Sequence, residues 1–513
     1  MRSLAVYSKF LAMFLFSLLV ACGGSSNNSD PVDPVDPVDP VDPDYSSEAP
    51  STYNFTNSTY TAEPADSVSY TGQVARQLLI MGMVDTMEAM ERSAKNKAGF
   101  LADLDLFMSG DGVDDAETGF RLKNGEADGS DILDAVTYRD ISSGKNLDGK
   151  IAGGNGEGGG ETSKLIGGEF FGWEGKTEDG LEIDLPIGLV DSWMAALASQ
   201  AVDGASFTVP VEGGDDVNVN SVHYDSDGRN YRQLLQKFLM GAVSFSQGTN
   251  DYFQSDWAVQ VTTQEGSKNY TEAEHNYDEA FGYYGAARDN NDYTDLEARA
   301  KNGRDDWKNG YYDTNGDGFI DPRSEFNFGH AQNCAKRDVG SADNANPTDF
   351  STEAMDAFLA GRHIIANASA AGSITDAELE ELQGHIKTAA LTWEKCIAAT
   401  AIHYINDVTN DIAEFSNGSY ASVGNFTNLG KHWSELKGFA LSLQFSPFSP
   451  FRDAAVTAVN LDSLKTVLSN IGDKPVLAND TQGNIDAYKL DLIEARTILQ
   501  NAYSFDPVNV AEW

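Results

Sequence analysis

Positive charge is scarce in this sequence. Its 513 residues include 35 Lys and Arg against 79 Asp and Glu, which gives a formal net charge of −44 at pH 7. Such a chain repels phosphate backbones and anionic headgroups, so the composition argues against nucleic acid or an anionic lipid surface as a partner. The surplus of carboxylates suits a saline medium and the binding of cations.

Long hydrophobic runs are also scarce, and the clearest one lies at the N-terminus. Arg2 and Lys9 precede an apolar run over 10–21, which is too short to remain as a membrane span and is typical of a signal peptide. The run ends in Leu-Val-Ala-Cys-Gly at 19–23, which resembles the lipobox of bacterial lipoproteins. We therefore predict cleavage after residue 21 and lipidation of Cys22; the alternative is an ordinary secretory signal followed by an unmodified cysteine.

The segment after Cys22 is predicted to be a spacer. Proline recurs at every third position over 31–43, which favours an extended polyproline-type chain that its aspartates keep solvated. Gly23 stands where an Asp would signal retention in the inner membrane, so we expect an outer-membrane lipoprotein that faces the periplasm or the cell surface. The predicted N-terminal organisation is a signal peptide at 1–21 and a lipidated cysteine with its spacer at 22–50.

Cysteine is scarce as well. Once Cys22 is assigned to the lipid, only Cys334 and Cys396 remain. An oxidising periplasm would permit one disulfide between them, but two lone cysteines at unrelated positions are as often buried thiols. The sequence leaves both alternatives open.

Signatures of several enzyme classes are missing. The sequence contains no HExxH zinc-protease motif, no GxSxG nucleophile elbow and no GxxxxGK[ST] phosphate-binding loop. The glycines at 153–160 neither follow a predicted strand nor open a predicted helix, so we expect them to form a flexible loop. These absences favour a binding protein over an enzyme.

The rest of the chain is predicted to be all-α, with long irregular insertions. Apolar residues recur at helical spacing in eight segments, and Thr375 with Glu378 forms a capping box at the start of one of them. A Gly- and Asp-rich stretch at 109–169 is expected to be a loop. The expected helices cover 71–92, 187–201, 230–246, 271–285, 351–371, 375–415, 425–444 and 487–503.

Two parts of the chain, 51–345 and 346–513, look alike. In each, a lysine-containing helix is followed by an aromatic-rich helix that opens with a histidine. The pairs are Lys237 with His275, 38 residues on, and Lys395 with His432, 37 residues on. This pattern indicates an internal duplication of two helical bundles, and chance similarity between amphipathic helices is the alternative.

The segment Gly-Lys-His-Trp-Ser-Glu at 430–435 has the clearest chemical meaning. His432 and Glu435 lie at positions i and i+3, on one face of a predicted helix, where an imidazole nitrogen and a carboxylate can meet the same cation. The alternative is a His–Glu pair that only stabilises the helix.

This segment matches GxHxxE, the signature of the imelysin-like family, with Gly430, His432 and Glu435 in the family positions. Other segments, among them YTGQVARQLL, EHNYDEAFGYYG and NFGHAQNCAKRD, also resemble a branch of that family found as bacterial lipoproteins, and the resemblance spans 51–513. It implies an all-helical fold of two bundles, a place in the periplasm or outer membrane, and a link to iron acquisition. Some members of the family are described as metallopeptidases.

Two ligands are too few for tight binding of a transition metal, which takes three or four donors. Further ligands are expected from the matching helix of the first half, with His275, Asp278 and Glu279 as candidates. His403 and His363 sit among apolar neighbours in the sequence and are interpreted as packed core histidines.

A second motif predicts a calcium site. Residues 313–321 place oxygen donors at positions one, three, five, seven and nine of an EF-hand-like loop, with Gly318 at six and Ile320 at eight. Position twelve, where an EF-hand has a bidentate acid, is Ser324, and the acid follows one residue later as Glu325. The predicted calcium ligands are Asp313, Asn315, Asp317, Phe319, Asp321 and Glu325. An acidic, turn-rich loop that holds no ion is the alternative.

The sequence thus predicts a duplicated, imelysin-like helical protein with one calcium loop, anchored by lipid at the cell envelope. Its expected task is to bind a metal ion, with iron favoured over other transition metals, or a metal-carrying ligand. The first alternative is a metallopeptidase with Glu435 as general base and His432 as ligand. The second is a non-catalytic envelope scaffold in which that pair is structural.

Overall fold

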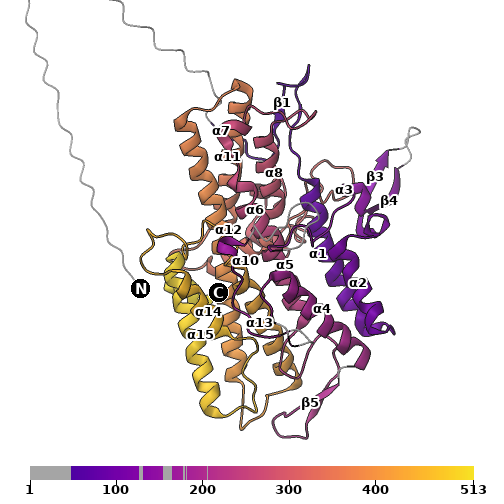
Figure 1. Ribbon diagram of the computed structural model, residues 1–513, viewed down its shortest axis with the longest axis vertical. Helices are drawn as coiled ribbons and strands as arrows, with labels where there is room; N and C mark the ends of the chain where they lie inside the picture. The colour runs from indigo at the N-terminus through magenta and orange to yellow at the C-terminus, as the bar shows by residue number, and fades with distance from the viewer. Residues whose placement is uncertain (1–47, 126–130, 154–164, 177–179, 181, 205) are drawn as a thin grey trace, which may run out of the picture. The chain divides into compact units, whose positions relative to one another are not determined.

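The computed structural model describes residues 48–513, except 126–130, 154–164, 177–179, 181 and 205. The predicted signal peptide, the lipidation site Cys22, most of the spacer and most of the glycine run after 153 lie outside the described residues. The described residues of 48–513 belong to one compact unit, which is mostly helical as the all-α prediction requires (Figure 1). None of the helices described is both long and apolar enough to cross a membrane.

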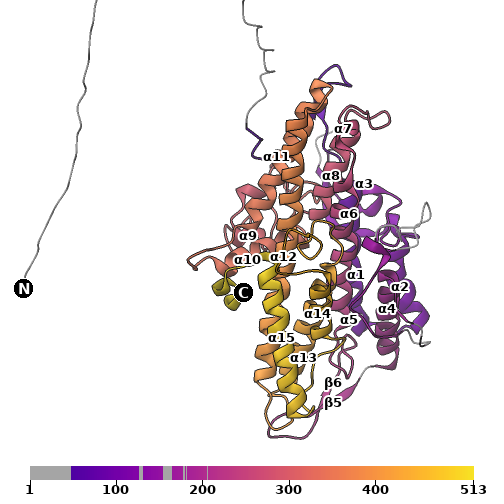
Figure 2. The same ribbon diagram turned by 60° about the vertical axis from the view of Figure 1, so that its left-hand side comes forward.

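A helix of 38 residues organises the C-terminal part. This helix, α12 (Asp376–Ala413), packs against α11 (Phe350–Ala371) and α13 (Val423–Ser442) (Figure 2). It begins at the predicted capping box, where the Thr375 hydroxyl accepts a hydrogen bond from the Glu378 amide and the Glu378 carboxylate accepts one from the Thr375 amide. The middle of α12 is buried around most of its circumference, so contacts on several sides fix its position.

The N-terminal helices pack in sequence order. The first, α1 (Thr71–Ala89), lies against α2 (Lys97–Ser109), α2 lies against α4 (Pro186–Asp203), and α4 lies against α5 (Tyr231–Leu239). Because α5 also packs against α13, it joins these helices to the C-terminal group.

The remaining helices flank this core. Helix α8 (Glu272–Tyr284) contacts α1 and α11, α10 (Gly329–Ser341) contacts α12, and α14 (Leu461–Ile471) lies beside α15 (Gln482–Tyr503) (Figure 1). The shorter helical elements are η1 (Met90–Arg92), η2 (Val113–Asp115), α3 (Tyr138–Ser142), η4 (Ile166–Gly168), the π-helical η5 (Met240–Phe245), α6 (Ser246–Asn250), η6 (Tyr252–Gln254), α7 (Trp257–Gln260), η7 (Asn290–Asp292), α9 (Asp295–Ala298) and α16 (Pro507–Glu512).

Strands occur only as short antiparallel pairs among the residues described. The pairs are β1 (Thr56–Asn57) with β2 (Ala65–Asp66), β3 (Glu117–Gly125) with β4 (Asp131–Thr137), and β5 (Phe207–Val209) with β6 (Val217–Val219). The prediction of a loop throughout 109–169 is therefore wrong, because this stretch contains the β3–β4 hairpin and α3. Averaging the Gly and Asp content over the whole stretch hides two short segments able to pair as strands.

All eight predicted helices are present, as α1, α4, α5 with its continuation through η5 and α6, α8, α11, α12, α13 and α15. The sequence periodicity does not predict α2, α10 or α14. Predicted boundaries differ from the observed ones by a few residues at most, except that α15 begins at Gln482, five residues earlier than expected.

Cys334 of α10 and Cys396 of α12 form a disulfide, with their Cα atoms 4.8 Å apart. Both residues are fully buried, and the Tyr284 hydroxyl of α8 lies 3.4 Å from the Cys334 Sγ. Of the two alternatives that the sequence leaves open, the structure therefore shows the disulfide. It fixes α10, which follows the predicted calcium loop, to the central helix.

Loss of this disulfide should destabilise the protein. We expect reduction, or Cys396→Ser, to lower the free energy of unfolding by about 2–4 kcal/mol, because the bond restricts the unfolded chain across a sequence separation of 62 residues. Urea unfolding with and without reductant measures the difference, and a thiol assay verifies the reduction. Reductant should have no effect on the Cys396→Ser variant. Equal stability of the oxidised and reduced wild-type protein would contradict the prediction.

Candidate functional site

The histidine and the glutamate of the GxHxxE motif have different partners. His432 of α13 places its Nδ1 2.8 Å from the Asp411 Oδ2 of α12. Glu435, one turn further along α13, instead faces Lys237 of α5, with 3.6 Å between its Oε1 and the Lys237 Nζ. The motif therefore contributes to two neighbourhoods, one against α12 and one against α5.

The first neighbourhood is a group of four titratable side chains, His403, Asp407, Asp411 and His432, which we call the His–Asp cluster. The His403 Nε2 lies 3.3 Å from the Asp407 Oδ2, and the His432 Nε2 lies 3.9 Å from the same oxygen. His403, Asp407 and Asp411 follow one another at four-residue intervals, so they share one face of α12. The packing of α13 on α12 then brings His432 to that face.

Charge and burial act differently on the two imidazoles. Burial alone would lower the pKa of His432, but the hydrogen bond and the charge of Asp411 outweigh it and raise that pKa. Burial, together with the charge of Arg337, lowers the pKa of His403 to about 4. His403 is therefore neutral at pH 7, and it carries a nitrogen lone pair that can bind a cation.

The interpretation of His403 as a packed core histidine is wrong. Its side chain is 28% exposed and pairs with Asp407, so it belongs to a polar face of α12. His363, the other residue given this interpretation, is also only half-buried, and its Nε2 lies 3.1 Å from the Asn367 side-chain nitrogen. Neighbours in the sequence are a poor guide here, because the residues beside a histidine in a helix point in other directions.

The second neighbourhood lies around Glu435 and is more deeply buried. Burial lowers the pKa of Lys237 even though Glu435 raises it, and burial with the charge of Lys237 lowers the pKa of Lys336 to about 7. The pKa of His330 falls to about 3, again mainly through burial. The Glu435 Oε2 has no hydrogen-bond partner among the described residues. Glu435 thus compensates buried lysine charge.

The additional ligands expected from α8 have partners of their own. The Asp278 carboxylate accepts hydrogen bonds from Arg362 Nε at 2.8 Å, from the Tyr53 hydroxyl at 2.9 Å and from the Ser69 amide at 2.9 Å. Arg362 also pairs with Glu274 at 3.1 Å, and the side chains of this trio are fully buried. This geometry makes Asp278 part of a buried ion cluster.

His275 and Glu279 lie on another face of α8. The His275 Nδ1 is 3.2 Å from the Ser69 carbonyl oxygen, and its Nε2 is 3.8 Å from the Glu279 carboxylate. Glu279 accepts a hydrogen bond from the Gln73 amide at 2.7 Å. Both residues line a cavity at the start of α1, whereas His432 is engaged with α12.

The predicted calcium loop brings its acids together through backbone hydrogen bonds. Glu325, the acid that comes one residue late, is 3% exposed and turns into the loop. Its Oε1 accepts a hydrogen bond from the Thr314 amide at 3.0 Å, and its Oε2 accepts one from the Asp321 amide at 2.8 Å. The Asp313 Oδ1 accepts one from the Gly316 amide at 2.8 Å.

Two features near the loop bear on its affinity for a cation. Asp289, whose pKa is raised by burial, lies beside the loop: its Oδ2 accepts from the Thr314 hydroxyl at 3.0 Å, and its Oδ1 has no partner among the residues described. Asp321, in contrast, pairs with Arg323 at 2.6 Å, which opposes its use as a ligand. Within the described ranges, no group of three or more His, Cys, Asp and Glu side chains is arranged to hold a metal ion as it stands.

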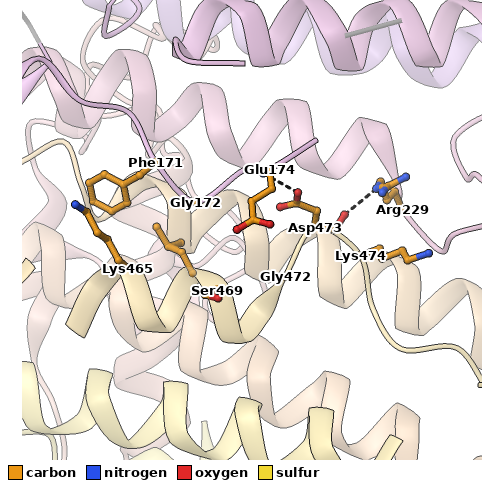
Figure 3. Close-up of a pocket in the computed structure, with 10 residues that line it drawn as sticks. Phe171, Gly172, Glu174, Arg229, Lys465, Ser469, Gly472, Asp473 and Lys474 are labelled. Atoms are coloured by element: carbon orange, nitrogen blue, oxygen red, sulfur yellow. Dashed lines mark hydrogen bonds between the residues drawn. The ribbon is translucent and has the colours of Figure 1, made fainter. Parts of the chain in front are cut away.

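A cavity of about 550 Å³ lies between the segment after Phe171 and the end of α14 (Figure 3). The Glu174 amide donates to the Asp473 carboxylate at 2.7 Å, and the Arg229 Nε donates to the Asp473 carbonyl at 2.8 Å. Buried Lys437 lies 3.5 Å from the same carboxylate. Asp473 therefore joins the segment of Glu174, the Arg229 side chain and Lys437 at this cavity.

The family described as "Domain of unknown function (DUF4856)" matches residues 182–464, so the chain belongs to this family. The match runs from just before α4 into α14, and it includes the His–Asp cluster, Glu435 with Lys237, and the predicted calcium loop. The chain matches no curated protein and no solved structure.

Asp407 and Asp411, which lie closest to the two imidazoles, are not among the site residues predicted from the sequence. A signal for them exists, because His403, Asp407 and Asp411 form a polar stripe with four-residue spacing along α12. The pairing of Glu435 with Lys237 has no comparable signal, since it depends on how α5 packs against α13.

The buried ion cluster on α8 should be important for stability. We expect Arg362→Met to lower the free energy of unfolding by about 3–5 kcal/mol, because it leaves two buried carboxylates without their cation. Lys395→Met, which removes a partly exposed ion pair with Glu353, should cost at most about 1 kcal/mol. Urea unfolding compares the two variants, and equal losses would show that the buried cluster has no special role.

Proposed function

We propose that the protein is a cell-envelope lipoprotein of imelysin-like type that binds a metal ion, with iron favoured, or a metal-carrying ligand. The observation that carries this proposal is the His–Asp cluster, in which two imidazoles and two carboxylates face one another across α12 and α13. Mixed nitrogen and oxygen donors of this kind suit iron, zinc and other transition metals.

The donor geometry supports the proposal. If the Nδ1 of His432 donates its proton to Asp411, the lone pair of the His432 ring lies on Nε2, on the side of Asp407. Donors that share one metal at about 2.0–2.2 Å lie about 3 Å apart. The nitrogen–oxygen distances of 3.3 and 3.9 Å around Asp407 are close to that value, which supports Asp407 as the oxygen donor between the two imidazoles.

In this proposal His432, His403 and Asp407 are the ligands, and Asp411 orients the ring of His432. Glu435 is not a ligand, because it is engaged with Lys237; its charge contributes to the raised pKa of His432. A bound metal would act here as the cargo that the protein retains.

We also propose that the loop before α10 binds calcium through Asp313, Asn315, Asp317, Phe319, Asp321 and Glu325. The inward position of Glu325 supports this assignment, because it supplies the acid that the sequence spacing puts in doubt. The ion would stabilise the long connection that leads to α10 and its disulfide. The lipid anchor at Cys22, the outer-membrane location and the duplication of two bundles are parts of the same proposal that rest on the sequence.

A scaffold function is the second candidate, and one observation favours it. Both residues of the motif already have partners within the protein, His432 with Asp411 and Glu435 with Lys237. A scaffold needs the pair only for packing. Among the residues described, Glu435 pairs with Lys237, and no contact there favours its use as the general base of a metallopeptidase.

Metal content tests the first candidate. We expect wild-type protein loaded with iron or zinc to retain about one ion per chain after dialysis, and His432→Ala and Asp407→Asn to lose most of it, because each removes a proposed donor. Elemental analysis measures the content. The matched control is His385→Ala. It removes a histidine of α12 whose Nε2 also lies near a carboxylate, 3.8 Å from that of Glu381.

The control should retain its metal. A wild-type protein that retains no transition metal, while His432→Ala melts at a lower temperature, would support the scaffold instead. Equal metal loss in His385→Ala would place the binding elsewhere.

Calcium should raise the melting temperature of the protein. At about 100 times its Kd the ion is expected to stabilise the fold by about 2.7 kcal/mol, since it binds the folded loop alone. Asp313→Ala should abolish the response, and Asp305→Ala, at an exposed acid close by, should preserve it. Thermal unfolding with calcium and with chelator measures the shift, and an unchanged response in Asp313→Ala would rule out this loop as the site.

A further inference from the structure

A cavity of about 370 Å³ at the start of α1 concentrates positive charge in this acidic protein. Four cationic side chains line it, from Arg76, Lys145, Lys150 and Lys268, and Glu279 is the only carboxylate in the described lining. This cluster of cationic side chains contrasts with the net charge of −44 of the whole chain.

The start of α1 adds the positive end of a helix dipole to this cavity. Its first turn contains no acidic residue, and no side chain caps it. The amides of Thr71 and Gly72 have no hydrogen-bond acceptor in the described part of the chain. Lys145 runs across this turn, since a Cβ placed on Gly72 would lie 3.1 Å from the Lys145 Cε. An ammonium group beside a helix N-terminus is unfavourable unless an anion lies between them.

Arg76 is held in place by backbone oxygens. Its Nε donates to the Asn146 carbonyl at 3.0 Å, and its Nη1 donates to the Gly72 carbonyl at 3.3 Å. Neither acceptor neutralises the guanidinium, and no ion pair joins Arg76 to a carboxylate of the described residues. Burial and the charge of Arg76 lower the pKa of Lys145, so the two cations repel one another.

A buried amide at the cavity also lacks a partner. Gln73, which is 1% exposed, donates from Nε2 to Glu279 at 2.7 Å, while its Oε1 has no hydrogen-bond partner among the residues described. Buried polar atoms are nearly always paired, so this oxygen points to a missing donor. A hydroxyl on a bound molecule would supply one.

We propose that this cavity binds a small organic or inorganic oxyanion, with a phosphate or carboxylate group held between Arg76, Lys145 and the first amides of α1. The volume exceeds that of a single anionic group, so the ligand has room for a hydroxyl-bearing portion beside Gln73. This site is separate from the His–Asp cluster and does not depend on metal binding.

Titration calorimetry of the purified protein with inorganic phosphate and with succinate tests the proposal. At least one of them should bind, and which one binds identifies the anionic group. Lys145→Gln should weaken binding about tenfold and the more exposed Lys268→Gln about threefold, because each removes one charge from the cavity.

Two controls make the result specific. Lys387→Gln removes a surface lysine of α12 outside the cavity and should change the affinity less than twofold. His432→Ala should also leave anion binding unchanged, so a failure of the proposed metal site cannot be mistaken for a failure here. Absence of binding for both anions, or equal weakening in Lys387→Gln, would overturn the proposal. If Lys145→Gln fails to fold, Lys268→Gln alone decides.

Discussion

The packing of α12 between its neighbours is the constraint on which the proposed site depends. The middle turns of this helix are buried on nearly every side, so a rotation or a shift along its axis would expose apolar surface and open cavities. The disulfide to α10 adds a covalent restraint in the same region. These contacts fix where the polar stripe of α12 emerges, and the position of α13 then decides that His432 meets Asp411 and Asp407.

The protein also buries charge in two clusters outside that stripe. Arg362 with its two carboxylates, and Glu435 with Lys237, are each enclosed by helices from distant parts of the sequence. Burying an ion pair is costly in itself, and such pairs are tolerated because each partner compensates the other. The first cluster connects α8 with α11, and the second connects α5 with α13.

Helical periodicity predicts the fold class and eight of the helices, because an amphipathic segment must bury one face whatever its neighbours are. It cannot give the partners of a side chain that points into an interface. His432 and Glu435 share a helix face by spacing alone, yet the residues that they contact come from α12 and α5. Of the three metal ligands proposed here, the sequence predicts only His432.

The predicted calcium loop depends on local spacing instead. Its acid Glu325 is turned into the loop although it comes one residue late in the sequence. The turn at 322–324, directly before Glu325, accommodates the one-residue offset, and the sequence pattern alone does not reveal this. The cavity at α1 has no sequence signal at all, since its cations come from α1, the segment after α3, and the turn before α8.

X-ray absorption spectroscopy of the iron- or zinc-loaded protein tests the central claim most directly, because it reports which atoms bind the metal. The account predicts a first shell that includes two imidazole nitrogens at about 2.0–2.1 Å and carboxylate oxygen, and loss of one imidazole in His403→Ala. A shell of oxygen alone, with no imidazole contribution, would contradict a metal site between α12 and α13.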